Sequence, residues 1–137
     1  MADHQSDTEM KAWCVRVNFK ISRKSRQNGN GCLIWRGAQR SVPAHRSAPP
    51  QYGQISCRVP GSKRRTMKSV HRVVYMAHTG NFDLPRECDV SHLCHNSLCV
   101  LFQHLSLEPR CINNMRKTCR RLKVCQGHGD FKNCILL

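Results

Sequence analysis

The segment from Met10 to Ile21 has the first regular pattern of apolar and polar side chains. Apolar residues stand at every second position from 13 to 21, with a cysteine and polar residues between them. Strict alternation predicts a β-strand, because successive side chains of a strand point to opposite faces. A short helix is the alternative interpretation. Residues 1–9 are polar, so residues 1–29 are expected to form a polar N-terminal arm and a first element.

The next segments predict short regular elements separated by turns. A turn signal at 28–31 leads into residues 32–37, whose first four side chains are apolar and predict a short buried strand. Residues 38–51 include three prolines and no regular pattern, so we expect a loop. Residues 70–78 place their apolar side chains on one face of a helix, and residues 79–81 predict the end of that helix.

Residues 52–59 and 63–70 predict an antiparallel hairpin, with Pro60-Gly61 as its turn. Its return strand is expected to hold four basic residues, Lys63, Arg64, Arg65 and Lys68. A two-stranded ribbon fits the major groove of DNA, where outward side chains reach base edges. An ordinary surface hairpin is the alternative, but the number of basic residues favours DNA contact. The residues expected to touch DNA are Gln54, Arg58, Lys63, Arg65 and Lys68.

The length of 137 residues predicts one domain, and the mix of elements predicts the α+β class, a small mixed domain with antiparallel β-hairpins. Apolar residues make up 39% of the chain and aromatic residues 6%. Few large apolar side chains are therefore available for a core, and we expect cross-links to stabilise it. Lysine and arginine number 23 against 8 acidic residues, a formal net charge of +15. This excess favours a polyanionic partner, and we expect double-stranded DNA.

Ten cysteines could supply the cross-links, as disulfides or as zinc thiolates. The first residues show no apolar core of a secretory signal, and several cysteines stand at ligand spacing beside histidines, so zinc is favoured. We therefore expect an intracellular protein, nuclear in a eukaryote, that is not secreted and has no membrane span. The alternative, a secreted cationic protein rich in disulfides, would contain no zinc.

Two sets of cysteine and histidine residues have the composition and spacing of zinc sites. Cys94, Cys99 and His104 are separated by four residues each and supply three ligands from one compact loop. The fourth ligand has three candidates, of which we favour the first: Cys32, Cys88 and Cys111. The second set is complete within sixteen residues: Cys119, Cys125, His128 and Cys134. Four protein ligands leave no open position, so both zinc sites are expected to be structural.

His92 and Asn113 are the candidates for chemistry. His92 stands two residues before Cys94, so it points with that cysteine but lies a full pleat away and does not easily join the zinc tetrahedron. A histidine titrates near pH 6.5, roughly, and can accept a proton from water at neutral pH. Mg²⁺ prefers oxygen ligands and keeps several waters, so one amide oxygen plus phosphate oxygens can hold it. The pair indicates a nuclease with one catalytic metal ion.

One run extends this interpretation to a known family: Ser91-His92-Leu93-Cys94-His95-Asn96, then Cys99, His104, Asn113 and Cys119. It resembles the His-Cys box of the homing endonucleases, part of the ββα-metal (His-Me finger, HNH-related) superfamily. The upstream segments 31–35, 52–55, 70–75 and 79–80 are also similar and occur in the same order. The resemblance covers about residues 30–134, so residues 30–137 are expected to form a His-Me finger nuclease domain.

The resemblance implies a role for each matched residue. His92 would be the general base, and Asn113 the sole protein ligand of a catalytic Mg²⁺ that stabilises the leaving 3′ oxygen. The two zinc sites would be Cys32, Cys94, Cys99 and His104, and Cys119, Cys125, His128 and Cys134. An arginine of the hairpin would support the scissile phosphate, with Arg64 and Arg65 nearest the expected place and Arg58 as a third candidate.

The resemblance thus implies a Mg²⁺-dependent DNA endonuclease that hydrolyses phosphodiester bonds. The alternative is a non-catalytic, zinc-stabilised DNA-binding module derived from such a nuclease. The sequence departs from the family at its end, because Leu137 stands three residues after Cys134, where the best-matching member has a tail that builds its dimer. Homodimerisation is therefore left open.

Overall fold

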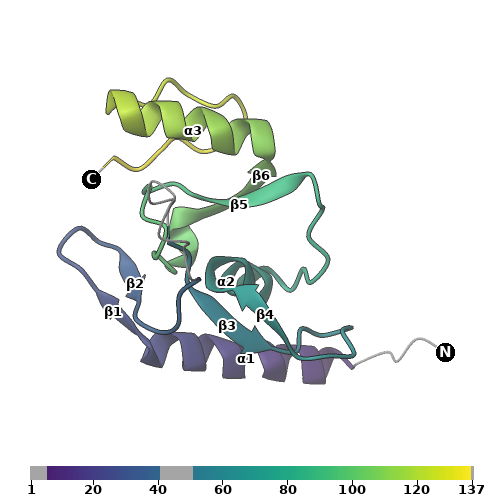
Figure 1. Ribbon diagram of the computed structural model, residues 1–137. Helices are drawn as coiled ribbons and strands as arrows, with labels where there is room; N and C mark the ends of the chain where they lie inside the picture. The colour runs from purple at the N-terminus through teal and green to yellow at the C-terminus, as the bar shows by residue number, and fades with distance from the viewer. Residues whose placement is uncertain (1–5, 41–50, 137) are drawn as a thin grey trace.

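The computed structural model describes residues 6–40 and 51–136 (Figure 1). Its elements are α1 (Asp7–Arg23), β1 (Ser25–Gln27), β2 (Leu33–Trp35), β3 (Gln54–Cys57), β4 (Thr66–Ser69), α2 (Val70–Thr79), β5 (Cys88–His92), the 3₁₀ turn η1 (Phe102–His104), β6 (Leu105–Pro109) and α3 (Arg110–Leu122). The strands form three antiparallel pairs, β1–β2, β3–β4 and β5–β6. The expected α+β class with hairpins is confirmed. The loop expected at 38–51 falls mostly outside the described residues.

The strand predicted between residues 10 and 21 is wrong, because the segment belongs to helix α1. A serine hydroxyl caps its first turn, and two acidic residues there favour the positive end of the helix dipole. Val17 and Ile21, four residues apart, are buried, whereas Val15 and Phe19 are 69% and 63% exposed. The apolar side chains that face the core therefore follow the helical period, and the alternation arose from apolar residues on the solvent side.

Helix α2 lies at the centre of the molecule, between α1 and the β5–β6 hairpin (Figure 1). The expected helix is confirmed with one further residue, Thr79, and its C-cap is Gly80, whose φ of 71° suits the left-handed cap of a helix. Most of its side chains are buried in a core that draws on every hairpin: Val17, Ile21, Trp35, Ile55, Cys57, Val59, Val70, Val73, Val74, Met76, Ala77, Val90, Val100 and Leu105. This core fixes the β5–β6 hairpin, on which the site is built.

Strands β1 and β2 pair across the predicted turn, with Ser25 opposite Trp35 and Gln27 opposite Leu33. The short strand expected at 32–37 is confirmed as β2, whereas the segment before the turn was expected as a basic link and forms β1. Two hydrogen bonds join β2 to the loop that follows β5: Trp35 N donates to Leu98 O at 2.9 Å, and Val100 N to Leu33 O at 2.7 Å. The N-terminal half thus anchors the loop that holds the cysteines.

The basic hairpin is confirmed as β3–β4, but its charges are distributed differently from the prediction. Strand β4 begins at Thr66, so Lys63, Arg64 and Arg65 lie in the connection and Lys68 is the one basic residue on the strand. The reason is the length of the connection, which runs from Arg58 to Arg65 around the turn at Pro60-Gly61. Lys68 lies opposite Ile55, the residue after Gln54. The side chains of Lys68 and Gln54 therefore point to opposite faces of the ribbon.

Helix α3 packs across the β5–β6 hairpin and forms the expected ββα arrangement with it (Figure 1). A buried ion pair joins the two parts: Arg116 Nε and Nη2 donate to Glu108 at 2.6 Å and 2.8 Å. Burial raises the pKa of the Glu108 carboxyl, but the hydrogen bonds and charge of Arg116 outweigh it and leave the pKa below its ordinary value. Removing one partner of such a pair costs about 3–5 kcal/mol, so the geometry of α3 on the hairpin is strongly fixed.

Within residues 6–40 and 51–136, no helix is long and apolar enough to cross a membrane.

Candidate functional site

The first cysteine–histidine cluster consists of Cys32, Cys94, Cys99 and His104, whose ligand atoms all lie within 4.8 Å of one another. The sulfurs of Cys32 and Cys99 each stand 3.6 Å from His104 Nδ1. Tetrahedral zinc with ordinary bond lengths places its ligand atoms roughly 3.5–3.8 Å apart, so the cluster fits the ion. The structure brings Cys32 to this position, and neither of the alternatives considered from the sequence, Cys88 and Cys111, belongs to the cluster.

The thiols of this cluster are arranged for metal binding. The interaction with Cys94 lowers the pKa of the Cys99 thiol to about 5, and the same interaction raises the pKa of Cys94. Thiolate is the form that binds zinc, and metal binding releases the remaining protons. Cys99 and Cys32 are 0% and 2% exposed, so a metal here would be enclosed and structural.

The second cluster consists of Cys119, Cys125, His128 and Cys134 and meets the same 4.8 Å criterion. His128 Nε2 lies 3.6 Å from the sulfur of Cys119 and 3.4 Å from that of Cys134. Gly127 and Gly129 adopt positive φ angles of 84° and 62°, which lets the chain bend sharply around the histidine. A zinc ion here would tie the C-terminal loop to α3. Both clusters are therefore consistent with the two predicted zinc sites.

His92 and Asn113 line one cleft of about 460 Å³, although they come from different elements. His92 ends strand β5, and Asn113 lies in the first turn of α3. The other lining residues are Tyr52, His95, Ser97, Arg116, Lys117 and Arg120. The ββα arrangement thus brings His92 and Asn113, the two candidates from the sequence, to the same cleft.

A hydrogen bond to a backbone carbonyl fixes the tautomer of the His92 ring. Its Nε2 lies 3.1 Å from the carbonyl oxygen of Cys99. A carbonyl only accepts, so Nε2 donates, and in the neutral ring Nδ1 keeps a free lone pair. Burial lowers the pKa of His92 to about 4, so the ring is neutral at physiological pH. His92 therefore has the state that a general base requires.

Two aromatic side chains support the His92 ring. The ring centroids of His71 and His92 are 4.5 Å apart, and the ring of Tyr52 lies 6.1 Å from that of His92. His71 lies on α2 and is buried. Burial lowers its pKa well below the ordinary value, so His71 adds no charge beside His92. The stack restricts the rotation of His92.

The Asn113 side chain is oriented by an aspartate that the sequence did not single out. Asn113 Nδ2 donates to Asp89 Oδ2 at 3.1 Å, and Asp89 also pairs with Arg110 at 3.5 Å. Because the amide nitrogen is engaged, the amide oxygen remains available to a hard cation. Asp89 lies three residues before His92 on β5, beneath α3, and that position is the one signal by which the sequence could have revealed it.

The hairpin arginines lie elsewhere. Of the residues that the structure describes, those lining the cleft do not include Arg58, Arg64 or Arg65. Arg65 Nη1 donates to the backbone oxygen of Ser56 at 3.0 Å, and the three arginines are exposed. The cations that do line the cleft, Arg116, Lys117 and Arg120, come from α3 and were missed from the sequence, because their proximity to His92 depends on how the helix packs.

The family model described as the zinc-binding loop region of homing endonuclease matches residues 31–135, which include both clusters, His92 and Asn113. No curated protein and no solved structure matches the chain. The match spans more than half of the 137 residues and confirms the resemblance found in the sequence. The chain belongs to the homing endonuclease family that this zinc-binding loop region defines.

Proposed function

We propose that this protein is a Mg²⁺-dependent DNA endonuclease in which His92 is the general base and Asn113 the protein ligand of the catalytic metal. The observation that supports this most directly is the shared cleft, in which hydrogen bonds leave His92 Nδ1 and the Asn113 amide oxygen free. One group can accept a proton and the other can hold a hard cation. The cleft therefore offers both functions that phosphodiester hydrolysis needs.

The proposed reaction assigns a definite task to each side chain. His92 Nδ1 takes a proton from the attacking water as the new oxygen–phosphorus bond forms. Cys99 O holds the Nε2–H throughout and stabilises the imidazolium that results. The bond from phosphorus to the 3′ oxygen breaks, and this oxygen takes a proton from solvent. When bound, Mg²⁺ would stabilise the negative charge that develops on the leaving oxygen.

The charge of the chain supports DNA as the substrate. With a formal charge of +15, the protein attracts polyanions, and part of this charge lies on the exposed connection of the β3–β4 hairpin. The proposed DNA contacts on the hairpin remain Gln54, Arg58, Lys63, Arg65 and Lys68. Support of the scissile phosphate by Arg64 or Arg65 also remains a prediction from the family resemblance.

One observation favours the second candidate function, a zinc-stabilised DNA-binding module without catalysis. In the described part of the chain, no arginine of the hairpin lines the cleft with His92 and Asn113. If that arginine is essential, the protein binds DNA and does not cut it. Both functions require zinc and DNA binding, so only an assay of cleavage separates them.

The test is cleavage of long genomic DNA at low salt by zinc-loaded protein, with Mg²⁺ added or withheld. Genomic DNA is chosen because a short substrate can lack the target site. We expect double- or single-strand breaks only when Mg²⁺ is added. Pulsed-field gels measure the double-strand breaks and denaturing gels the single-strand breaks. Breaks without added Mg²⁺ would contradict the proposed metal, and DNA binding without any breaks would establish the non-catalytic module.

The substitution Asp89→Ala should raise the Mg²⁺ concentration needed for half-maximal cleavage by about 10-fold or more. Removing the partner that orients a metal ligand typically lowers metal affinity by about 10- to 100-fold. The Asn113 amide would lose its hydrogen bond at Nδ2 and could turn its nitrogen toward the metal. The measurement is the cleavage rate as a function of Mg²⁺ concentration.

The matched control is Arg110→Ala, which removes the other partner of Asp89 and leaves the Asn113 bond intact. This variant should need the same Mg²⁺ concentration as the wild type. An unchanged Mg²⁺ requirement in Asp89→Ala would show that Asp89 does not orient the amide.

A further inference from the structure

Helix α3 presents two cations to the catalytic cleft that have no role so far. Lys117 follows Asn113 by four residues, and Arg120 follows Lys117 by three, so the three side chains lie on one face of the helix. Lys117 and Arg120 are both exposed, and both line the cleft. They stand next to the position that a scissile phosphate would take between His92 and Asn113.

These two charges are not neutralised within the part of the chain that the structure describes. The ion pairs there are Arg110 with Asp89 and Arg116 with Glu108. Arg116 also lines the cleft, but its guanidinium is occupied by Glu108 and by the backbone oxygen of Lys132. Lys117 and Arg120 are therefore the cations of the cleft that are free to bind an anion.

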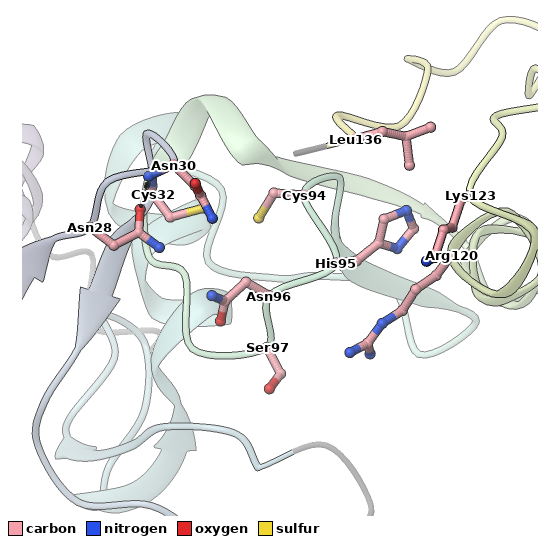
Figure 2. A pocket seen from close by; sticks show the side chains of 10 residues that line it. All are labelled: Asn28, Asn30, Cys32, Cys94, His95, Asn96, Ser97, Arg120, Lys123 and Leu136. Carbon is pink, nitrogen blue, oxygen red and sulfur yellow. Dashed lines mark hydrogen bonds between the residues drawn. The ribbon is translucent and has the colours of Figure 1, made fainter.

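A second hollow, of about 780 Å³, continues from the cleft along α3. The two hollows share three lining residues, His95, Ser97 and Arg120, and together form what we call the α3 groove. Figure 2 shows Arg120 and Lys123 on the helix side of this groove, with Asn28 and Asn30 of the β1–β2 turn on the other side.

The lining of the α3 groove has the chemistry of a phosphate-binding surface. Among the described residues, no aspartate or glutamate lines either hollow, so the positive potential of α3 is not opposed there. The asparagine side chains offer neutral N–H donors, which commonly contact phosphate oxygens in protein–DNA complexes. The cationic wall and the polar opposite wall thus adjoin the cleft that His92 lines.

We propose that the α3 groove binds the sugar–phosphate backbone of the substrate strand, with Lys117 and Arg120 each pairing with a phosphate beside the scissile one. This inference rests on the proposed function for its substrate, DNA. In this proposal, side chains of α3 supply the positive charge that neutralises the DNA strand that is cut. The sequence had predicted DNA contacts on the hairpin alone. Hairpin and groove would then hold different parts of the same duplex.

The test measures DNA binding without cleavage, by fluorescence anisotropy of a mixed-sequence duplex at several salt concentrations and without Mg²⁺. Each lost phosphate contact should reduce the slope of log affinity against log salt by about 0.9. We therefore expect a smaller slope and weaker binding for Lys117→Ala and for Arg120→Ala. Zinc content and thermal unfolding should match the wild type, because both side chains are exposed.

The matched control is Arg121→Ala, which removes the same charge from the next residue of α3. Arg121 is exposed and lines neither hollow, so this variant should keep the wild-type slope. The inference is overturned if Arg120→Ala keeps that slope, or if Arg121→Ala lowers it equally.

Cleavage assays separate this inference from the proposed function. Reduced slopes in a protein that makes no breaks would support the groove and refute the nuclease. Breaks by the wild type together with unchanged slopes in both variants would support the nuclease and refute the groove.

Discussion

Replacing His92 by alanine should lower the rate of Mg²⁺-dependent DNA cleavage by about 10²- to 10⁴-fold, the usual contribution of a positioned general base. The hydrogen bond from Nε2 to Cys99 O leaves Nδ1 as the proton acceptor, and the alanine side chain offers none. The loss should appear in the rate at saturating DNA, because the proposed mechanism has His92 act on the attacking water and not in binding of the substrate. The measurement is the initial rate of break formation with the wild type and the variant at equal zinc content.

The control for this variant is His78→Ala. His78 is exposed on α2, and its Nδ1 donates a hydrogen bond within its own helix to Val74 O. Its replacement should leave the cleavage rate unchanged. Anisotropy should show that His92→Ala still binds DNA, as expected if the residue acts in chemistry alone. If His92→Ala keeps the wild-type cleavage rate, His92 is structural and the proposed mechanism is wrong.

The ligand clusters could be predicted from the sequence because their information is local. Three ligands of the first cluster and all four of the second lie within short segments, and the spacing of cysteine and histidine identifies them. The fourth ligand of the first cluster was harder, since Cys32 is distant in sequence and reaches the cluster through the hydrogen bonds between β2 and the loop after β5. Spacing alone left it open among three cysteines.

Helix α1 shows why alternation misled the prediction of its first element. Val15 and Phe19 are apolar but exposed to solvent. Together with the buried Val17 and Ile21 they produce an alternating pattern that is typical of a strand. The stripe that decides the structure, Val17 and Ile21, emerges only when α1 packs on α2. Tertiary packing therefore overrode a clean local pattern.

The residues around the proposed catalytic pair were not predictable for a related reason. Asp89, Lys117 and Arg120 matter here through their distance to Asn113 and His92, and none belongs to a motif with a fixed spacing. Their proximity depends on the crossing of α3 over the β5–β6 hairpin, which the buried pair of Glu108 and Arg116 fixes. Tertiary contacts of this kind arise after the elements are packed.

The substitution Cys99→Ser should remove one zinc ion per chain and unfold the protein at ordinary temperatures. Structural zinc contributes about 10–16 kcal/mol of apparent binding energy in small zinc-dependent domains, comparable with or larger than the whole stability of a small protein. Cys99 is completely buried, and its cluster joins β2 to the loop after β5 and to η1. The measurements are zinc content by elemental analysis and thermal unfolding by circular dichroism.

The matched control is Cys111→Ser, because Cys111 is exposed and belongs to neither cluster. This variant should keep two zinc ions and the wild-type unfolding temperature. A Cys99→Ser protein that unfolds like the wild type would show that the first cluster does not stabilise the fold. Loss of free thiols in the wild type, measured under non-reducing conditions, would instead indicate disulfides in place of zinc.

The two clusters should also differ in how their loss affects catalysis. Cys99 belongs to the first cluster and its carbonyl orients His92, so under the proposed mechanism loss of the first zinc ion should abolish cleavage together with the fold of the loop. Cys134→Ser removes a ligand from the second cluster, which joins α3 to the C-terminal loop and does not include Cys99, whose carbonyl orients His92. We expect this variant to lose one zinc ion and to melt at a lower temperature while retaining measurable cleavage at low temperature. If both variants lose cleavage equally, the second zinc ion is as necessary for the position of Asn113 as the first zinc ion is for the position of His92.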